Sequence, residues 1–161
     1  MPSRLFPRQI DNTYHGLTMA LWLLAPILLV KLVMGFNVSG LNPFLGSRFV
    51  MQAADGIPIS SYPPDAAATA TLLFASWGLA LLLMSLFGIL ALIRYRGMTP
   101  LIYLLLTLEQ AGRKALSILH PIVRDTAPAG ISPGTAINWA LTGLLVLGLI
   151  LSLIEKRTAK S

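Results

Sequence analysis

The sequence predicts an all-α integral membrane protein, a four-helix bundle with a short interfacial helix in its first outer loop. Of the 161 residues, 55% are hydrophobic and only 11% are charged, whereas a soluble domain has about 25% charged residues. The mean hydropathy is +0.74. In addition, four apolar segments are each long enough to cross a hydrocarbon core of ~30 Å, which needs roughly 20 helical residues.

The four predicted spans cover most of the chain. They run at about 14–36, 66–93, 98–119 and 133–154. Residues 1–161 are expected to form a single domain, because no repeat or second unit remains outside the spans. The first apolar run is too long for a cleaved signal peptide and is interrupted by Lys31, so we expect it to stay as a membrane helix.

Helix boundaries are marked by prolines and polar residues. Thr99 and Ser132 each precede a proline and are predicted N-caps, and Asp65 is a third. Pro121 is expected to end the third span. The connection at 94–97 is so short that the second and third spans must run antiparallel. Small residues at helix-packing spacing, which either pack closely or recur by chance, are Ser76 and Ala80, Ala111 and Ala115, and Gly148 and Ser152.

Lysine and arginine residues predict the orientation, because they accumulate on the cytoplasmic side of a membrane. One side of the predicted layout holds seven: Arg4, Arg8, Arg94, Arg96, Lys156, Arg157 and Lys160. The other side holds only Arg48 and Arg124. We therefore expect both termini in the cytoplasm.

The long loop at 37–65 is expected to lie on the outer side. Within it, the stretch 43–54 predicts a short helix on the membrane surface. Its side chains expected to face lipid or protein are Phe44, Leu45, Phe49 and Val50. The proline-rich stretch that follows is either a cover over the mouth of the bundle or a docking loop.

The third span carries polar residues that an apolar helix would not need. With a rise of ~1.5 Å per residue, Glu109 lies ~14 Å from Pro100, near the bilayer midplane. Arg113 follows it at i, i+4, and Gln110 and Lys114 form a parallel pair. His120 continues this side towards the outer surface. Because a charge at the membrane centre costs at least roughly 2.5–3.5 kcal/mol, these residues should face the interior of the bundle.

Two interpretations of this polar face remain open. One is a purely structural Glu109–Arg113 pair, with Lys114 extended towards the outer interface. The other is a polar cavity open to the outer half of the membrane. If Lys31 of the first span also faces inward, three cations meet one carboxylate, which favours an anionic head group. Taken alone, Lys31 is better explained by extension to the nearby outer interface.

Several kinds of site are not expected. The chain has no cysteine, which excludes disulfides and thiolate ligands. His15 and His120 are predicted at opposite membrane faces, ~25–30 Å apart, so they cannot share a haem. We expect no catalytic residue, no metal ligand and no cofactor. The formal charge of +6 lies mainly beside apolar segments, so it favours orientation in a lipid membrane rather than binding of nucleic acid.

Three stretches resemble a family of small four-helix inner-membrane proteins of proteobacteria that has no assigned function. They are the sequences at 11–16, 54–64 and 94–100. The similarity covers most of the chain and implies the same four-span layout in the inner membrane of a bacterium, but it brings no activity. The layout is also distantly similar to that of DoxX-like membrane proteins.

The sequence therefore predicts a non-catalytic subunit or partner of a larger inner-membrane assembly, with other membrane proteins or copies of itself as partners. The alternative is a protein that binds or transports an anionic amphiphile such as a lipid, a quinone-like molecule or a carboxylate. Its candidate ligand-binding residues are Lys31, Glu109, Gln110, Arg113, Lys114 and His120. An enzyme is the least favoured class, because only Glu109 and His120 offer acid–base chemistry.

Overall fold

The computed structural model describes residues 5, 7, 11–122 and 133–155. Within these ranges the chain is helical and has no β-strand. The helices are α2 (Thr18–Val38), α3 (Ser47–Ala53), α4 (Pro64–Arg94), α5 (Thr99–Leu119) and α6 (Pro133–Leu153), with 3₁₀ turns η1 (Ile59–Ser61) and η2 (Arg96–Met98). This confirms the predicted all-α class.

Three helices, α2, α4 and α6, are long and apolar enough to cross a membrane. α5 is as long as α2 and α6: each contains 21 residues, which corresponds to a helix length of ~31 Å. It differs because Glu109, Arg113 and Lys114 lie within it. The structure thus supports a membrane protein, while a fourth span formed by α5 stays a prediction.

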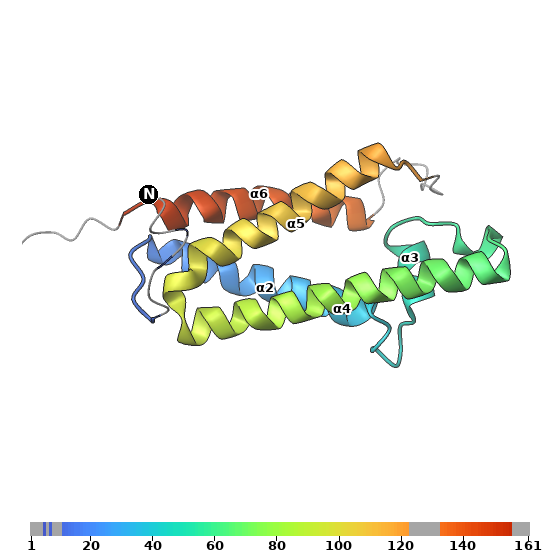
Figure 1. Cartoon of the computed structure of the whole chain (residues 1–161), viewed down its shortest axis with the longest axis horizontal. Helices are drawn as coiled ribbons and strands as arrows, with labels where there is room; N and C mark the ends of the chain where they lie inside the picture. The colour runs from blue at the N-terminus through green and yellow to red at the C-terminus, as the bar shows by residue number, and fades with distance from the viewer. Residues whose placement is uncertain (1–4, 6, 8–10, 123–132, 156–161) are drawn as a thin grey trace, which may run out of the picture.

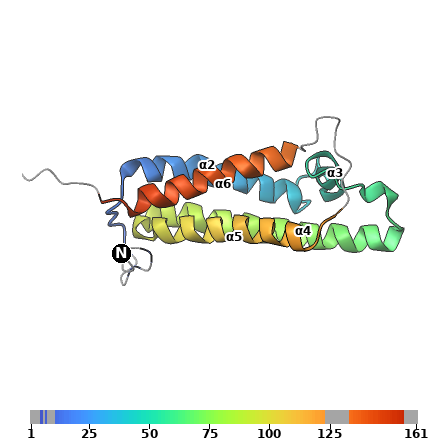
Figure 2. The same ribbon diagram turned by 90° about the horizontal axis from the view of Figure 1, so that it is seen from above.

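The four long helices run side by side (Figures 1 and 2). α4 packs chiefly against α2, and α5 packs chiefly against α6, which also contacts α2. η2 joins α4 to α5, and these two helices run in opposite directions, as the short connection predicts (Figure 1). The core between the helices is apolar and includes the fully buried Leu24, Leu28, Leu106 and Leu145.

Glycines set how closely the helices approach. A Cβ atom on Gly35 of α2 or Gly78 of α4 would collide with the backbone of the facing helix, and one on Gly148 of α6 would collide with the ring of Tyr103. Tyr103 is fully buried and donates a hydrogen bond to the carbonyl of Ala20 at 2.7 Å. It therefore links α5 to α2 while it packs on α6.

Only one of the predicted small-residue pairs packs inside the chain. Gly148 and Ser152 are buried on α6. The other two pairs, Ser76 with Ala80 on α4 and Ala111 with Ala115 on α5, are exposed. For these pairs the spacing did not predict packing within the chain.

The loop at 37–65 forms the expected short helix, but the helix is shorter than the predicted 43–54. α3 begins at Ser47, after Gly46 with an extended backbone. The residues before it form a turn, in which the Asn42 side chain accepts a hydrogen bond from the Phe44 backbone N–H at 2.9 Å. Phe44 and Phe49 are 90% and 59% exposed, as predicted for residues that face lipid or a partner, whereas Leu45 and Val50 are half-buried. The opposite side of α3 places Met51 in a small cluster with Ile59 and Ala67.

The predicted N-caps were placed one or two residues too late. Met98 is the N-cap of α5 and Thr99 is its first residue. Likewise, Pro63 is the N-cap of α4 and Asp65 lies in the first turn. Ser132 lies outside the described residues. The predicted end of the third span is confirmed, because α5 ends at Leu119, shortly before Pro121.

The start of α2 and the end of α6 lie at the same end of the molecule. The Leu17 N–H donates to the Leu151 carbonyl at 3.3 Å. At this end the Gly97 N–H in η2 also donates to the carbonyl of Asp11 at 3.3 Å. The short connection that carries Arg94 and Arg96 therefore lies beside both of these segments.

Candidate functional site

α5 separates its polar and apolar residues on two sides. Gln110 is buried and Glu109, Arg113 and Lys114 are partly buried. The opposite side is exposed: Leu105, Leu108, Ala111, Ala115 and Leu119. This confirms for Glu109, Gln110, Arg113 and Lys114 the prediction that the polar residues face the interior of the helix assembly, whereas His120, predicted on the same side, is exposed.

Glu109 lies between two cations. Its Oε2 atom accepts a hydrogen bond from the Lys31 Nζ of α2 at 2.7 Å. Its Oε1 atom lies 2.8 Å from the Arg113 Nε, one helical turn further along α5. The predicted i, i+4 pair is therefore present, and a second cation shares its carboxylate.

Lys31 is almost completely buried, with 1% of its surface exposed. Extension to the outer interface, which its position in the sequence favoured, is therefore wrong. The reason is the partner: the carboxylate of Glu109 compensates the ammonium inside the assembly, which a lone lysine would not achieve. Lys31 thus joins α2 to the polar face of α5.

Arg113 connects α5 with two further helices. Its Nη2 atom donates to the side-chain oxygen of Gln110, and to Asn138 Oδ1 of α6 at 2.8 Å. The guanidinium also lies over the ring of Trp77 of α4, 4.6 Å from the ring centre, a favourable cation–π contact. Gln110 strengthens the link to α6, because its Nε2 donates to the Asn138 carbonyl at 3.2 Å.

Lys114 occupies a separate place beside this network. Its Nζ lies over the ring of Trp139, 3.1 Å from the ring centre. Trp139 itself is 62% exposed on α6. A second cation–π contact therefore holds an ammonium group at the edge of α5 and α6.

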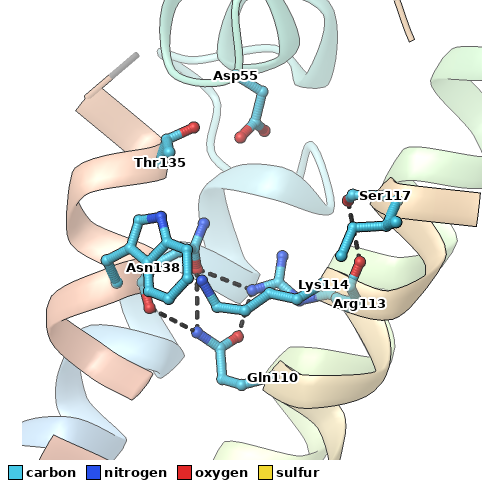
Figure 3. Close-up of a pocket in the computed structure, with 9 residues that line it drawn as sticks. Asp55, Gln110, Arg113, Lys114, Ser117, Thr135 and Asn138 are labelled. Carbon is cyan, nitrogen blue, oxygen red and sulfur yellow. Dashed lines mark hydrogen bonds between the residues drawn. The ribbon is translucent and has the colours of Figure 1, made fainter. Parts of the chain in front are cut away.

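A pocket of about 280 Å³ opens between α5 and α6 beside these residues. Gln110, Arg113, Lys114 and Ser117 line it from α5, and Thr135, Asn138 and Trp139 line it from α6. Asp55, from the loop after α3, points towards it (Figure 3). The pocket therefore reaches from the loop at 37–65 to the buried hydrogen-bond network.

The structure brings together five of the six candidate residues. Lys31 and Glu109 lie behind the pocket, joined to it through Arg113. His120 does not belong to this group: it is the exposed C-cap residue of α5 and is absent from the pocket lining. Eleven positions on α5 correspond to ~16 Å, so Glu109 and His120 do not form an acid–base pair.

The charge of the site is positive. Three cations, Lys31, Arg113 and Lys114, meet two carboxylates, Glu109 and Asp55. The surplus positive charge lies on the pocket side, because the carboxylate of Glu109 also compensates the buried Lys31 behind the pocket. Among the described residues, no group of three His, Asp or Glu side chains gathers as a metal site. The arrangement is thus suited to electrostatic and hydrogen-bond recognition of an anion.

Sequence reasoning missed Asn138, Trp77 and Asp55. Asn138 carried a usable signal, because it is a lone amide within an otherwise apolar helix, and such residues bond across helices in membranes. Nothing in the sequence distinguished Trp77 from a packing residue. Asp55 could not be assigned to the pocket from the sequence, because its position there depends on how the loop after α3 folds.

The comparisons leave the chain without an assigned relative. Protein-family models, curated proteins and solved structures give no match to it. The similarity to small four-helix inner-membrane proteins and to DoxX-like proteins therefore stays a prediction, and the function has to be inferred from the site.

Proposed function

We propose that this chain is a four-span protein of the bacterial inner membrane that binds an anionic amphiphile in the pocket between α5 and α6. The observation that carries the proposal is the pocket itself, where Arg113 and Lys114 lie beside the amide of Asn138. A guanidinium, an ammonium and an amide are donors that suit a carboxylate or a phosphate.

The membrane placement is supported by helix length and charge. α5 reaches the same ~31 Å as α2 and α6, and its charged residues face other helices rather than lipid. The Leu17–Leu151 contact puts the beginning of α2 and the end of α6 at one end, as an even number of spans requires. The seven-to-two distribution of lysine and arginine puts that end in the cytoplasm.

The amphiphilic character of the ligand follows from the size and surroundings of the pocket. Pockets that enclose a whole drug-sized molecule have about 300–1,000 Å³, so 280 Å³ suits a head group. Ile118 and Trp139, which line the pocket, are 80% and 62% exposed. An apolar tail attached to the head group would therefore lie over these side chains, in the lipid.

Purification in mild detergent, with mass spectrometry of everything that co-migrates, tests this function. We expect an anionic lipid, quinone-like molecule or carboxylate with the wild type and its loss from Lys114→Gln. Arg94→Gln is the matched control, because it removes one exposed cation at the opposite end of the assembly. An amphiphile retained equally by all three proteins, or found in none, would contradict the proposal.

The second candidate is a non-catalytic subunit of a larger inner-membrane assembly. The observation that favours it is the exposure of Ser76 with Ala80 on α4 and of Ala111 with Ala115 on α5, since small residues at this spacing let membrane helices approach closely. A stoichiometric protein partner in the same purification supports this candidate. Ala111→Leu would then release the partner, yet leave any bound amphiphile in place.

A further inference from the structure

A groove lies outside the α5–α6 pocket, where α3 and the loop after it meet the beginning of α4. It consists of two adjoining hollows of about 570 Å³ and about 520 Å³. Both are lined by Arg48 and Pro64, so they adjoin at these two residues. Arg48 is exposed, so its guanidinium is accessible at the junction.

The two hollows differ in chemistry. The first is mixed: Gln52, Ser60 and Tyr62 contribute amide and hydroxyl groups beside the apolar Phe49 and Ile59. The second follows α4 and contains mainly small and apolar side chains, including Leu72, which is 67% exposed. A guanidinium with amide and hydroxyl groups on one side and a mainly apolar hollow on the other matches the order of head group, phosphate and acyl chain in a phospholipid.

The position of the groove along α4 agrees with this order. With Arg94 at the inner edge of the hydrocarbon, a rise of ~1.5 Å per residue puts Ala75 ~28 Å and Pro64 ~45 Å further out. The hydrocarbon core is ~30 Å thick and the bilayer with both head-group layers is ~40–45 Å thick, so the outer head-group layer ends about 35–38 Å from the inner hydrocarbon edge. In the proposed placement, Ala75 therefore lies at the outer edge of the hydrocarbon, the middle of the groove crosses the outer head-group layer, and Pro64 lies beyond it.

We propose that this groove binds one phospholipid of the outer leaflet through its phosphodiester. The phosphate pairs with Arg48, the head group meets Gln52 and Tyr62, and an acyl chain passes Leu72 and enters the hydrocarbon beside Ala75. A guanidinium is suited to this role because its planar fork matches phosphate oxygens. The inference rests on the proposed membrane placement but not on a ligand in the α5–α6 pocket.

Native mass spectrometry tests the inference with the full chain released from phosphatidylglycerol nanodiscs. We expect the wild type to keep one phospholipid that Arg48→Gln loses roughly 10-fold or more readily, the scale of one charge-assisted hydrogen bond. Ala68→Trp, which fills the apolar hollow without changing charge, should lose it too. Arg94→Gln, the control for a lost cation, should retain it. Circular dichroism checks that each variant is folded.

Three results would overturn the inference: retention of the lipid by Arg48→Gln, its retention by folded Ala68→Trp, or equal loss from Arg48→Gln and Arg94→Gln. Lys114→Gln separates this site from the α5–α6 pocket, because it should leave the groove lipid bound. Ser60→Cys separates it from the membrane placement. The chain has no other cysteine, so labelling by a water-soluble thiol reagent from the cytoplasmic side alone would refute the placement and, with it, the groove lipid.

Discussion

Glu109 compensates two cations, so removing it should be more harmful than removing either cation. Glu109→Gln leaves Lys31, whose side chain is 2% exposed, without its carboxylate partner. Breaking a buried ion pair in this way costs roughly 3–5 kcal/mol. Arg113→Leu keeps the Lys31–Glu109 contact at 2.7 Å and removes an arginine that is 28% exposed. Its cost should be roughly 1–3 kcal/mol, from the unsatisfied groups of Gln110 and Asn138.

The double variant Lys31→Met/Glu109→Gln separates a true pair from two independent residues. It should be less destabilised than Glu109→Gln alone, because no uncompensated ammonium remains, and the recovery should be roughly 0.5–3 kcal/mol. The measurement is reversible unfolding of the purified variants in mild detergent, followed by circular dichroism during a denaturant titration. Two results would refute the claim that Glu109 compensates both cations: additive losses of stability in the double variant, or an Arg113→Leu variant as unstable as the Glu109→Gln variant.

The other predictions concern packing and topology. Tyr103→Phe should cost about 1 kcal/mol in the same unfolding assay, because it deletes the hydrogen bond to the Ala20 carbonyl; an unchanged stability would show that the bond contributes nothing. Gly148→Leu should prevent close packing against the Tyr103 ring, whereas Ala111→Leu, on an exposed face, should not; equal losses of folded protein would contradict this. A reporter that works only in the cytoplasm should be active when fused to either end of the chain, and a reporter that works only on the outer side should be inactive there. Activity of the second reporter would reverse the orientation. Spin labels along 43–54 should alternate between lipid and water exposure with a helical period within α3, and a uniform deep-lipid signal would contradict a surface helix.

The polar face of α5 could be predicted from the sequence because its residues lie on one helix. The i, i+4 spacing of Glu109 and Arg113 fixes their proximity wherever the helix lies, and the membrane makes their outward exposure costly. The contact between them and the exposure of Leu108 opposite follow from these two facts alone. The all-helical class followed in the same way from composition.

The partners contributed by other helices could not be predicted, because they depend on which faces meet. Lys31 on its own favours extension to the interface, and only the rotation of α2 against α5 brings it to Glu109. Asn138 likewise needed the pairing of α5 with α6. The late start of α3 could not be predicted for a local reason: Asn42 accepts a hydrogen bond from the Phe44 N–H, and this bond is the same in a turn and at a helix N-cap.

The most direct test of the account is the reactivity of a single thiol in the α5–α6 pocket. Ser117→Cys places that thiol in the pocket lining of a chain that has no cysteine. We predict that a water-soluble methanethiosulfonate added on the outer side labels it, whereas Leu108→Cys on the exposed apolar face stays unlabelled. After normalisation to a free thiol, the anionic reagent should react about tenfold faster than the cationic one, since one net charge at ~6 Å in water changes the energy of each reagent by ~0.7 kcal/mol with opposite sign. No labelling of Ser117→Cys, or faster labelling by the cationic reagent, would contradict an outward-facing anion pocket.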